Sequence, residues 1–254
     1  MRSGRRILFE VCVETAAGAV AARDGGADRV ELCANLLEGG VTPSAGAVGY
    51  VRDQLDIPVM VLVRPRGGDF VYSDGEMDVM RRDIASLRDA GVDGVVVGAL
   101  RPDATVDVDR TRAFVEAAGP MQVTFHRAFD MCIDPRAALE QLVELGVDRI
   151  LTSGQEDAAL DGIALIAELV EQAGNRIRIM PGGGIVESDI RRVLELSKAT
   201  EVHFAAGASL ESPMEFRNSR CSMGCGTVPD EYELRVTDPA RVREFVDQAT
   251  RDPH

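Results

Sequence analysis

The segment Met121–Asp130, MQVTFHRAFD, places a histidine beside an arginine at the end of an apolar run. The 254-residue chain has three histidines, His126, His203 and His254. From Gln122 to His126 polar and apolar residues alternate, so the polar side chains of a strand here would share one face. An imidazole beside a guanidinium can transfer protons or bind an anion. A core histidine satisfied by hydrogen bonds would give the same pattern.

Two cysteines occupy matching positions in the short segments Glu-Val-Cys12 and Glu-Leu-Cys33. Neighbouring strands lie about 4.8 Å apart, so the two thiols can meet if these segments pair. Two thiolates suit a soft ion such as Cu(I). Two small thiols packed in a core are the alternative. A second pair, Cys221 and Cys225, has a spacing that is not diagnostic of zinc.

The elements that must position these residues are eight short apolar runs alternating with segments of helical periodicity. Eight such units in about 250 residues favour a (β/α)₈ TIM barrel over an open, doubly wound α/β sheet. We expect residues 1–254 to form a single domain of this kind. The expected strands are residues 7–13, 28–33, 58–64, 93–99, 121–127, 148–153, 176–181 and 201–206.

A weak internal repeat supports this division. Gly-Ala-Asp-Arg-Val (26–30), Gly-Val-Asp-Gly-Val (91–95) and Gly-Val-Asp-Arg-Ile (146–150) each connect a helix to a strand. Asp134-Pro135 and Asp238-Pro239 are typical helix starts, with a capping side chain followed by proline in the first turn.

Long connections from strand to helix, at residues 34–43, 65–74 and 207–237, gather at the carboxyl ends of the strands. Barrels build their functional sites at this face. Charged groups there must pair with each other or meet a ligand, because burying them alone is costly. The side chains that we expect at this face are Glu10, Cys12, Glu31, Cys33, Arg64, Arg66, His126, Arg127, Ser153 and His203.

A glycine-rich segment, Met180-Pro-Gly-Gly-Gly-Ile185, follows the seventh predicted strand. Gly182 and Gly183 would let backbone N–H groups approach an anion near the start of the next helix. A simple tight turn explains the segment equally well.

Composition narrows the class of partner. The net charge of −14 argues against nucleic acid, and no apolar run approaches the ~18 residues of a membrane span. Glu10 and Glu14 interrupt the first apolar stretch, so we expect no signal peptide and a cytoplasmic location with reduced cysteines. Lys198 is the only lysine, a bias that either a GC-rich genome or a salt-rich cytoplasm would produce.

Long, ordered motifs resemble the CutC family of copper homeostasis proteins over almost the whole chain. They are FEVCV (9–13), GGADRVELCANLLEGGVTPS (25–44), VRPRGGDFVYSD (63–74), VTFHRAFDM (123–131), ILTSGQ (150–155), MPGGGI (180–185) and EFRNS (215–219). The resemblance implies a (β/α)₈ barrel, a cytoplasmic role in copper handling, and a homodimer or larger homo-oligomer. Cys12 and Cys33 lie in family-like segments and are the candidate Cu(I) ligands. One departure is His203-Phe-Ala-Ala-Gly207, where the family tends to read His-x-Ser-Ala-Arg; the missing arginine weakens the case for phosphate binding.

Different functions therefore remain open. The first is a copper-binding homeostasis protein without turnover. The second is an enzyme acting on a small anionic metabolite that Arg64 and Arg127 hold, with Glu10 or Glu31 as base and His126 as acid in proton-transfer or lyase chemistry. A scaffold that binds a ligand without changing it is the third.

Overall fold

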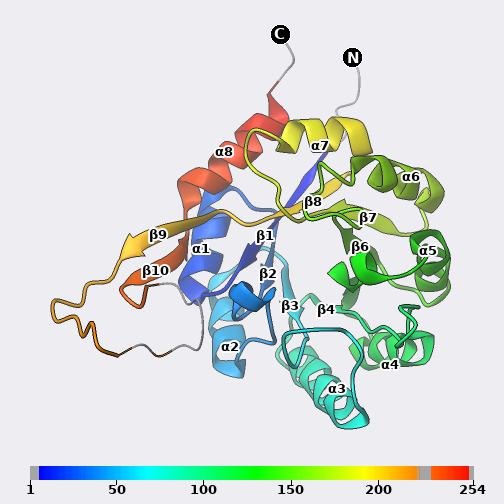
Figure 1. The fold of residues 1–254 in the computed structure, drawn as a ribbon, viewed down its shortest axis with the longest axis horizontal. Helices are drawn as coiled ribbons and strands as arrows, with labels where there is room; N and C mark the ends of the chain where they lie inside the picture. Colours follow the sequence, from blue (N-terminus) through cyan, green and yellow to red (C-terminus); the bar gives the residue numbers. More distant parts are fainter. Residues whose placement is uncertain (1–5, 222, 224–229, 252–254) are drawn as a thin grey trace.

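Eight parallel strands surround a central axis and helices cover their outer side (Figure 1). The computed structural model describes residues 6–221, 223 and 230–251. Every strand lies within the range predicted for it, and the (β/α)₈ TIM barrel is confirmed. The strands are β1 (Leu8–Val13), β2 (Arg29–Leu32), β3 (Val59–Leu62), β4 (Gly94–Val97), β5 (Gln122–Phe125), β6 (Arg149–Thr152), β7 (Arg178–Pro181) and β8 (Glu201–Phe204).

Each strand pairs with its neighbours in sequence from β1 to β7, and β8 pairs with β1. The first and last strands of the barrel are therefore hydrogen-bonded, with Glu10 opposite His203. On its other side β1 sets Cys12 opposite Glu31 of β2. Strands β7 and β8 are in contact but, among the described residues, no ladder joins them.

Two helices begin at the capping residues predicted from the sequence. Asp134 and Asp238 accept hydrogen bonds from backbone N–H groups of the first helical turn, as predicted for the two Asp-Pro starts. The helices are α1 (Ala16–Gly25), α2 (Ala45–Gln54), α3 (Asp74–Asp89), α4 (Val108–Ala118), α5 (Pro135–Glu144), α6 (Ile163–Ala173), α7 (Ile190–Ser197) and α8 (Pro239–Thr250), with 3₁₀ turns η1 (Leu36–Glu38) and η2 (Arg127–Met131). None of the helices in the described part of the chain combines the length and apolarity needed to cross a membrane.

The internal repeat has a structural cause. In each copy the aspartate lies just before an even-numbered strand, and its carboxylate accepts a hydrogen bond from the backbone N–H near the start of the preceding odd-numbered strand. This bond fixes the register of the two strands where their ladder begins. The pairs are Phe9 to Asp28 at 3.0 Å, Val59 to Asp93 at 2.8 Å and Val123 to Asp148 at 2.8 Å.

Apolar side chains form two separate groups. The larger lies between strands and helices and includes the fully buried Phe114, Phe125 and Phe245. The smaller lies inside the barrel, where Met60 and Leu62 of β3 and Val96 of β4 pack with two cysteine side chains. Inside the barrel, apolar side chains thus gather on the β3–β4 side.

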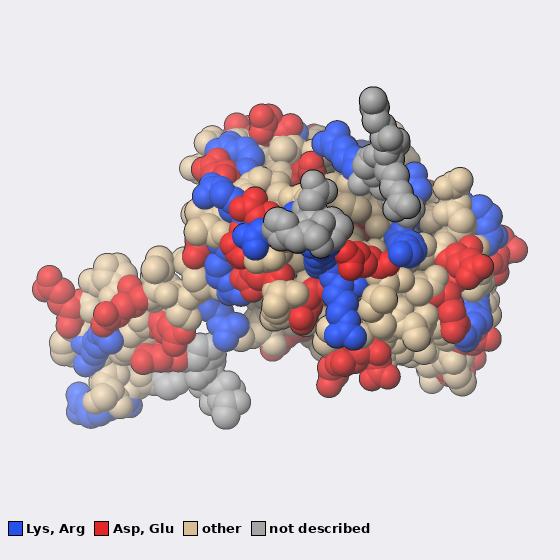
Figure 2. Space-filling view, turned by 90° about the horizontal axis from the view of Figure 1, so that it is seen from above, with Lys and Arg blue, Asp and Glu red and all other residues tan. Residues whose placement is uncertain are grey.

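The segment 207–237, predicted as a long connection, contains a hairpin of its own. Strands β9 (Gly207–Glu211) and β10 (Glu233–Thr237) pair antiparallel and extend away from the barrel (Figure 1). Both faces of β9 are largely exposed, so no alternation of apolar and polar residues marked it as a strand. Figure 2 shows acidic and basic side chains interspersed over the hairpin and the barrel face beside it.

Candidate functional site

A network of four buried charges fills the floor of the barrel. Arg29 of β2 donates hydrogen bonds to Glu10 of β1 and, from Nη2 at 2.8 Å, to Oε2 of Glu201 on β8. Arg149 of β6 donates to the same Glu201 carboxylate and to Thr124 Oγ1 at 3.1 Å. Two cations and two anions therefore neutralise one another, as buried charges must. We call these four residues, Glu10, Arg29, Arg149 and Glu201, the floor network.

Both carboxylates of the floor network remain ionised. Burial alone would raise the pKa of Glu10, but the Arg29 guanidinium and a hydrogen bond with His203 lower it. Burial opposes ionisation of Glu201 too, but its hydrogen bond and charge interaction with Arg149 lower its pKa.

A glycine makes room for this network. Arg29, Gly94, Arg149 and Glu201 are the first residues of the four even-numbered strands, which contribute one layer of a TIM-barrel interior. A Cβ at Gly94 would lie 2.7 Å from the Gln122 carbonyl oxygen and would overlap the Met60 side chain. The Met60 thioether thus occupies the place that a fourth side chain would take.

His203 connects the floor network to the layer above. Its Nδ1 lies 2.8 Å from Oε1 of Glu10, and its Nε2 lies 3.6 Å from Oε2 of Glu31. Burial by itself would lower the pKa of His203, but hydrogen bonds with Cys12 and Glu10 and the charge of Glu31 raise it well above its usual value. The imidazole is therefore an imidazolium held between two acidic layers.

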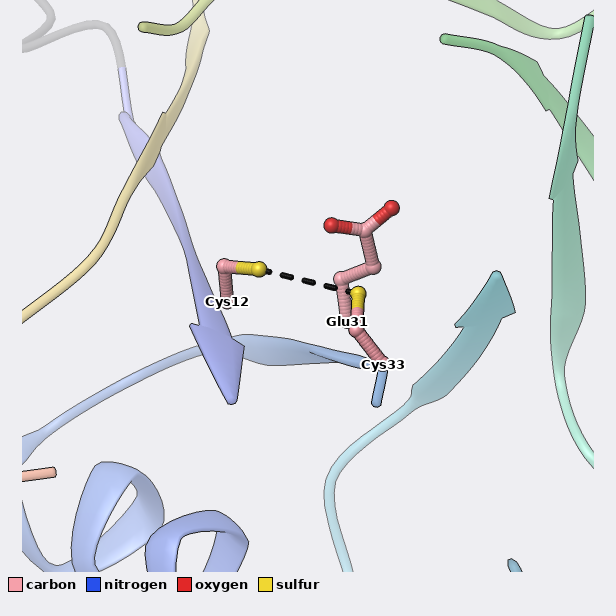
Figure 3. A group of neighbouring side chains, drawn as sticks. All are labelled: Cys12, Glu31 and Cys33. Atoms are coloured by element: carbon pink, nitrogen blue, oxygen red, sulfur yellow. Dashed lines mark hydrogen bonds between the residues drawn. The ribbon is translucent and has the colours of Figure 1, made fainter. Parts of the chain in front are cut away.

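The two predicted thiols meet above this imidazolium. The Sγ atoms of Cys12 and Cys33 are 3.7 Å apart, and both residues are buried and free of disulfides. Figure 3 shows the sulfurs facing each other from β1 and the end of β2, with the Glu31 side chain beside them. Ligand atoms of all three residues lie within 4.8 Å of one another. The expectation that the thiols meet across paired strands is confirmed.

The thiols share one proton unequally. The hydrogen bond from Cys33 lowers the pKa of Cys12 to about 5, whereas that same bond and burial raise the pKa of Cys33 well above its usual value. Burial, together with the charge of the Cys12 thiolate, raises the pKa of Glu31 well above its usual value. At neutral pH the site holds a thiolate and a thiol, and burial together with the thiolate charge disfavours ionisation of Glu31 beside them.

A cavity of about 720 Å³ opens above the thiols at the carboxyl face of the barrel. It brings together most of the predicted residues, which come from six strands and the loops that follow them. Those that line it are Cys12, Glu31, Cys33, Arg64, His126, Arg127, Gly183 and His203; Glu10, Arg66, Ser153 and Gly182 lie outside the lining.

The predicted residues outside the lining have local partners. Glu10 belongs to the floor network. Arg66 forms ion pairs with Glu76 at 2.6 Å and Asp69 at 3.0 Å on the surface. Gly182 packs against the side chains of β6 and β8. The structure therefore does not place Arg66 or Gly182 at the cavity.

Arg127 is held at the cavity rim by two side chains. Its Nε donates to Asp130 Oδ2 at 2.8 Å and its Nη2 to Ser153 Oγ at 2.7 Å. Its guanidinium lies over Gly183, whose φ is +100° and whose added Cβ would come 3.0 Å from Cζ of Arg127. Ser153 thus contacts Arg127 rather than lining the cavity, and the space above Gly183 is filled by the Arg127 side chain.

His126 lies one residue beyond β5, which ends at Phe125 rather than at Arg127 as expected. It caps η2, and its Nδ1 accepts a hydrogen bond from the Ala128 backbone N–H at 3.0 Å. The ring packs against Phe70, with centroids 5.0 Å apart. Burial and the nearby Arg64 charge lower the pKa of His126 to about 3, so the ring is neutral at physiological pH.

Arg64 holds the two long loops that follow β2 and β3. Its Nη1 donates to the carbonyl oxygens of Glu38 at 2.8 Å and Gly40 at 2.9 Å, and its Nη2 to that of Gly68 at 2.7 Å. The guanidinium also lies 5.1 Å from the centre of the Phe70 ring.

Sequence reasoning missed Arg29 and Arg149. Both follow the aspartate of the internal repeat, and Arg29 alternates with Glu31 along β2, which was the available signal. Of the second cysteine pair, Cys221 is exposed and Cys225 lies outside the described residues, as does His254.

Comparison with known proteins gives consistent matches. The model of the CutC family matches residues 7–208. The chain is 50% identical over 241 residues to the copper homeostasis protein cutC homolog of Mus musculus, covering 95% of this chain and 89% of that protein. Its identity to the corresponding Homo sapiens protein is 50% over 236 residues, covering 93% and 86%.

Solved structures agree. A crystal structure of the copper homeostasis protein CutC from Streptococcus agalactiae matches with a TM-score of 0.74 and 34% identity, covering 78% of this chain and 98% of that one. Phosphoribosylanthranilate isomerase from Thermotoga maritima matches with a TM-score of 0.56 at 12% identity, covering 96% and 98%, which shows the barrel fold alone. Since the family model covers most of the chain and its relatives are half identical, this chain belongs to the CutC family.

Proposed function

We propose that this protein acts in copper homeostasis and binds Cu(I) through the thiolates of Cys12 and Cys33. The observation that carries the proposal is the pair of free sulfurs, 3.7 Å apart, at the bottom of an open cavity. Thiolates are the soft ligands that select Cu(I). The names of the mouse and human relatives, copper homeostasis proteins, support the same role.

The charges around the sulfurs suit a monovalent cation. With both thiols deprotonated the pair carries two negative charges. One Cu(I) ion and the His203 imidazolium, held near the pair, supply two positive charges. Cu(I) thus displaces the proton of Cys33, and binding weakens as pH falls, because a ligating thiol must lose its proton. Glu31 offers a carboxyl oxygen beside the pair.

The experiment is an anaerobic Cu(I) competition titration of the reduced protein beside a Cys12→Ala/Cys33→Ala double variant. We expect one Cu(I) per chain, lost in the double variant. Cys221→Ala, which removes an exposed thiol, is the matched control and should bind as the unmodified protein does. Equal binding by the double variant would contradict the assignment.

We also propose a cytoplasmic location, where thiols stay reduced, and assembly into a homodimer or larger homo-oligomer. Light scattering during size-exclusion chromatography of the reduced protein measures the assembly directly. A monomer at all concentrations would contradict it.

Two residues named in the enzyme hypothesis, Glu10 and His126, are poorly suited to the acid and base roles that it requires. Glu10 is paired with Arg29 and is a poor candidate for a base. His126, neutral at physiological pH, is a hydrogen-bond donor rather than a proton source. A neutral imidazole of this kind can still polarise a carbonyl group, so ligand binding in the cavity is the part of this hypothesis that the geometry favours.

A further inference from the structure

We propose that the cavity above the thiols also binds a small organic carboxylate, whose oxygens accept hydrogen bonds from His126 Nε2–H and Arg64 Nε–H. Both residues line the cavity, and both pack against the ring of Phe70. Their two nitrogens are buried and, among the described residues, have no hydrogen-bond partner. Buried polar groups are nearly always paired, so two unpaired ones at one cavity indicate a ligand.

The tautomer of His126 follows from its backbone contact. Nδ1 accepts the N–H of Ala128 at 3.0 Å and so carries a lone pair. A neutral imidazole then has its proton on Nε2. The unpaired atom is consequently a donor, which requires an acceptor on the ligand.

The backbone also fixes the position of this donor. Gly98 follows β4 and lies against the imidazole, where a Cβ would come within 2.5 Å of Cε1 of His126. With Phe70 on another side, the ring has little freedom to turn Nε2 elsewhere. The donor is preorganised, which lowers the entropic cost of binding.

The charge of Arg64 points to an anion. Arg64 is only 5% exposed, and its hydrogen bonds go to backbone carbonyl oxygens. No carboxylate of the described residues forms an ion pair with it. A buried guanidinium that faces only neutral acceptors keeps an uncompensated charge, which an anionic ligand would neutralise.

The remaining lining favours a carboxylate over a phosphate. Leu62, Leu151 and Ile185 give the cavity apolar walls that suit a carbon skeleton. The space above Gly183, where a phosphate would contact backbone N–H groups, is occupied by Arg127. A carboxylate has two oxygens, each of which can accept a hydrogen bond from one of the two donors. The proposed carboxylate site uses neither thiol, and its occupancy does not depend on copper.

The test is a titration of the copper-free, reduced protein, labelled with ¹⁵N at histidine, with sodium acetate and sodium benzoate at constant ionic strength. With three histidines in the chain, His126 is assigned by substitution. We expect the Nε2 resonance of His126 to shift saturably while Nδ1 stays unprotonated. Acetate and benzoate affinities should fall about tenfold or more in His126→Phe, which keeps a ring against Phe70 but removes the donor.

Two further variants test whether binding depends on the Nε donor of Arg64 and not on arginine substitution in general. Arg64→Lys keeps the charge but removes the Nε donor and should weaken binding. Arg178→Met, an exposed arginine at the start of β7, is the matched control and should bind as the unmodified protein does.

Several results would overturn the proposal. They are a non-saturating shift at His126, equal binding by His126→Phe, or inorganic phosphate binding more tightly than acetate and benzoate. If His126→Phe fails to fold, the titration of the unmodified protein still decides, because the His126 resonance itself reports contact. Loss of Cu(I) binding in the cysteine variant with unchanged benzoate binding would show that the two sites are separate.

Discussion

The floor and the mouth of this barrel bury polar groups equally well but pair them differently. In the floor network each charge has an opposite charge within hydrogen-bonding distance. At the mouth two donors lack a partner among the described residues. Burial alone therefore does not distinguish a structural charge from a functional one, whereas pairing does. The exposed fractions are 1% for Glu10, 3% for Arg29, 4% for Arg149 and 8% for Glu201 in the floor, against 5% for Arg64 and 6% for His126 at the mouth.

Removing one charge of the floor network should have the largest effect on stability. Glu201→Gln leaves Arg29 and Arg149 with one carboxylate between them, and we expect the free energy of unfolding to fall by about 3–5 kcal/mol. Urea denaturation measures the change. The double variant Glu201→Leu/Arg149→Met should lose less than the single variant, because it removes an ion pair rather than stranding a cation. A loss below ~1 kcal/mol for Glu201→Gln would contradict the structural role.

The thiol pair gives a pH-dependent contrast. Because the pKa of Cys12 is lowered to about 5, its thiolate absorbance should appear near pH 5 rather than near the usual value of 9. A folded pKa below the unfolded one means that the stability contributed by this thiolate is complete above the unfolded pKa and is lost as pH falls through about 5. Ultraviolet titration of the thiolate measures the midpoint. Cys33→Ala should move it upward, since the hydrogen bond from Cys33 is the main cause of the shift.

At the mouth a substitution should cost much less than in the floor. His126→Phe removes the unpaired Nε2–H, which favours folding, but also removes the acceptor for the Ala128 N–H, which opposes it. We expect the two to offset to within about 1 kcal/mol. A loss as large as that of Glu201→Gln would show that His126 is structural and would remove the contrast.

We expect the smallest effect on the free energy of unfolding at an exposed ion pair, which serves as a baseline for the buried ones. Arg191 and Glu195 pair at 2.8 Å on α7, with side chains 32% and 60% exposed. Arg191→Ala should change the free energy of unfolding by about 0.5 kcal/mol or less, because exposed helical pairs are screened by water. Thermal denaturation of Arg191→Ala and Glu201→Gln under the same conditions compares the two losses of stability. A larger change would mean that pairing stabilises this protein regardless of burial.

The sequence predicts which side chains face the barrel interior, but it does not predict whether they lie in the floor or at the mouth. Alternation correctly places Glu10 and Cys12 on the inner face of β1, where Glu10 pairs with Arg29 and Cys12 lines the cavity. It does not say that a step of two residues, about 6.6 Å along a strand, separates a paired floor from an open cavity. Alternation alone therefore predicts Glu10 at the mouth. It does not indicate that Arg29 pairs with Glu10 in the floor network.

The paths of the long loops were the second feature that could not be predicted from the sequence. Arg66 follows Arg64 by two residues, yet only Arg64 turns inward, because the carbonyl groups of two loops converge on it. No local pattern encodes that convergence. The hairpin β9–β10 was not predicted either, because most of its residues are exposed and no alternation of buried and exposed positions marks its strands.

The pairing of β1 with β8 has a consequence for the order in which this protein is made. Glu10 and His203 are separated by 193 residues, and they meet only when the last barrel strand joins the first. During synthesis, which proceeds from the N-terminus, both cysteines leave the ribosome early, while their positively charged neighbour arrives near the end. A nascent chain thus carries Cys12 and Cys33 without His203, which adds to the effect of Cys33 in lowering the pKa of Cys12. The thiol pair therefore gains its neighbouring imidazolium only when β8 joins β1 and the barrel closes.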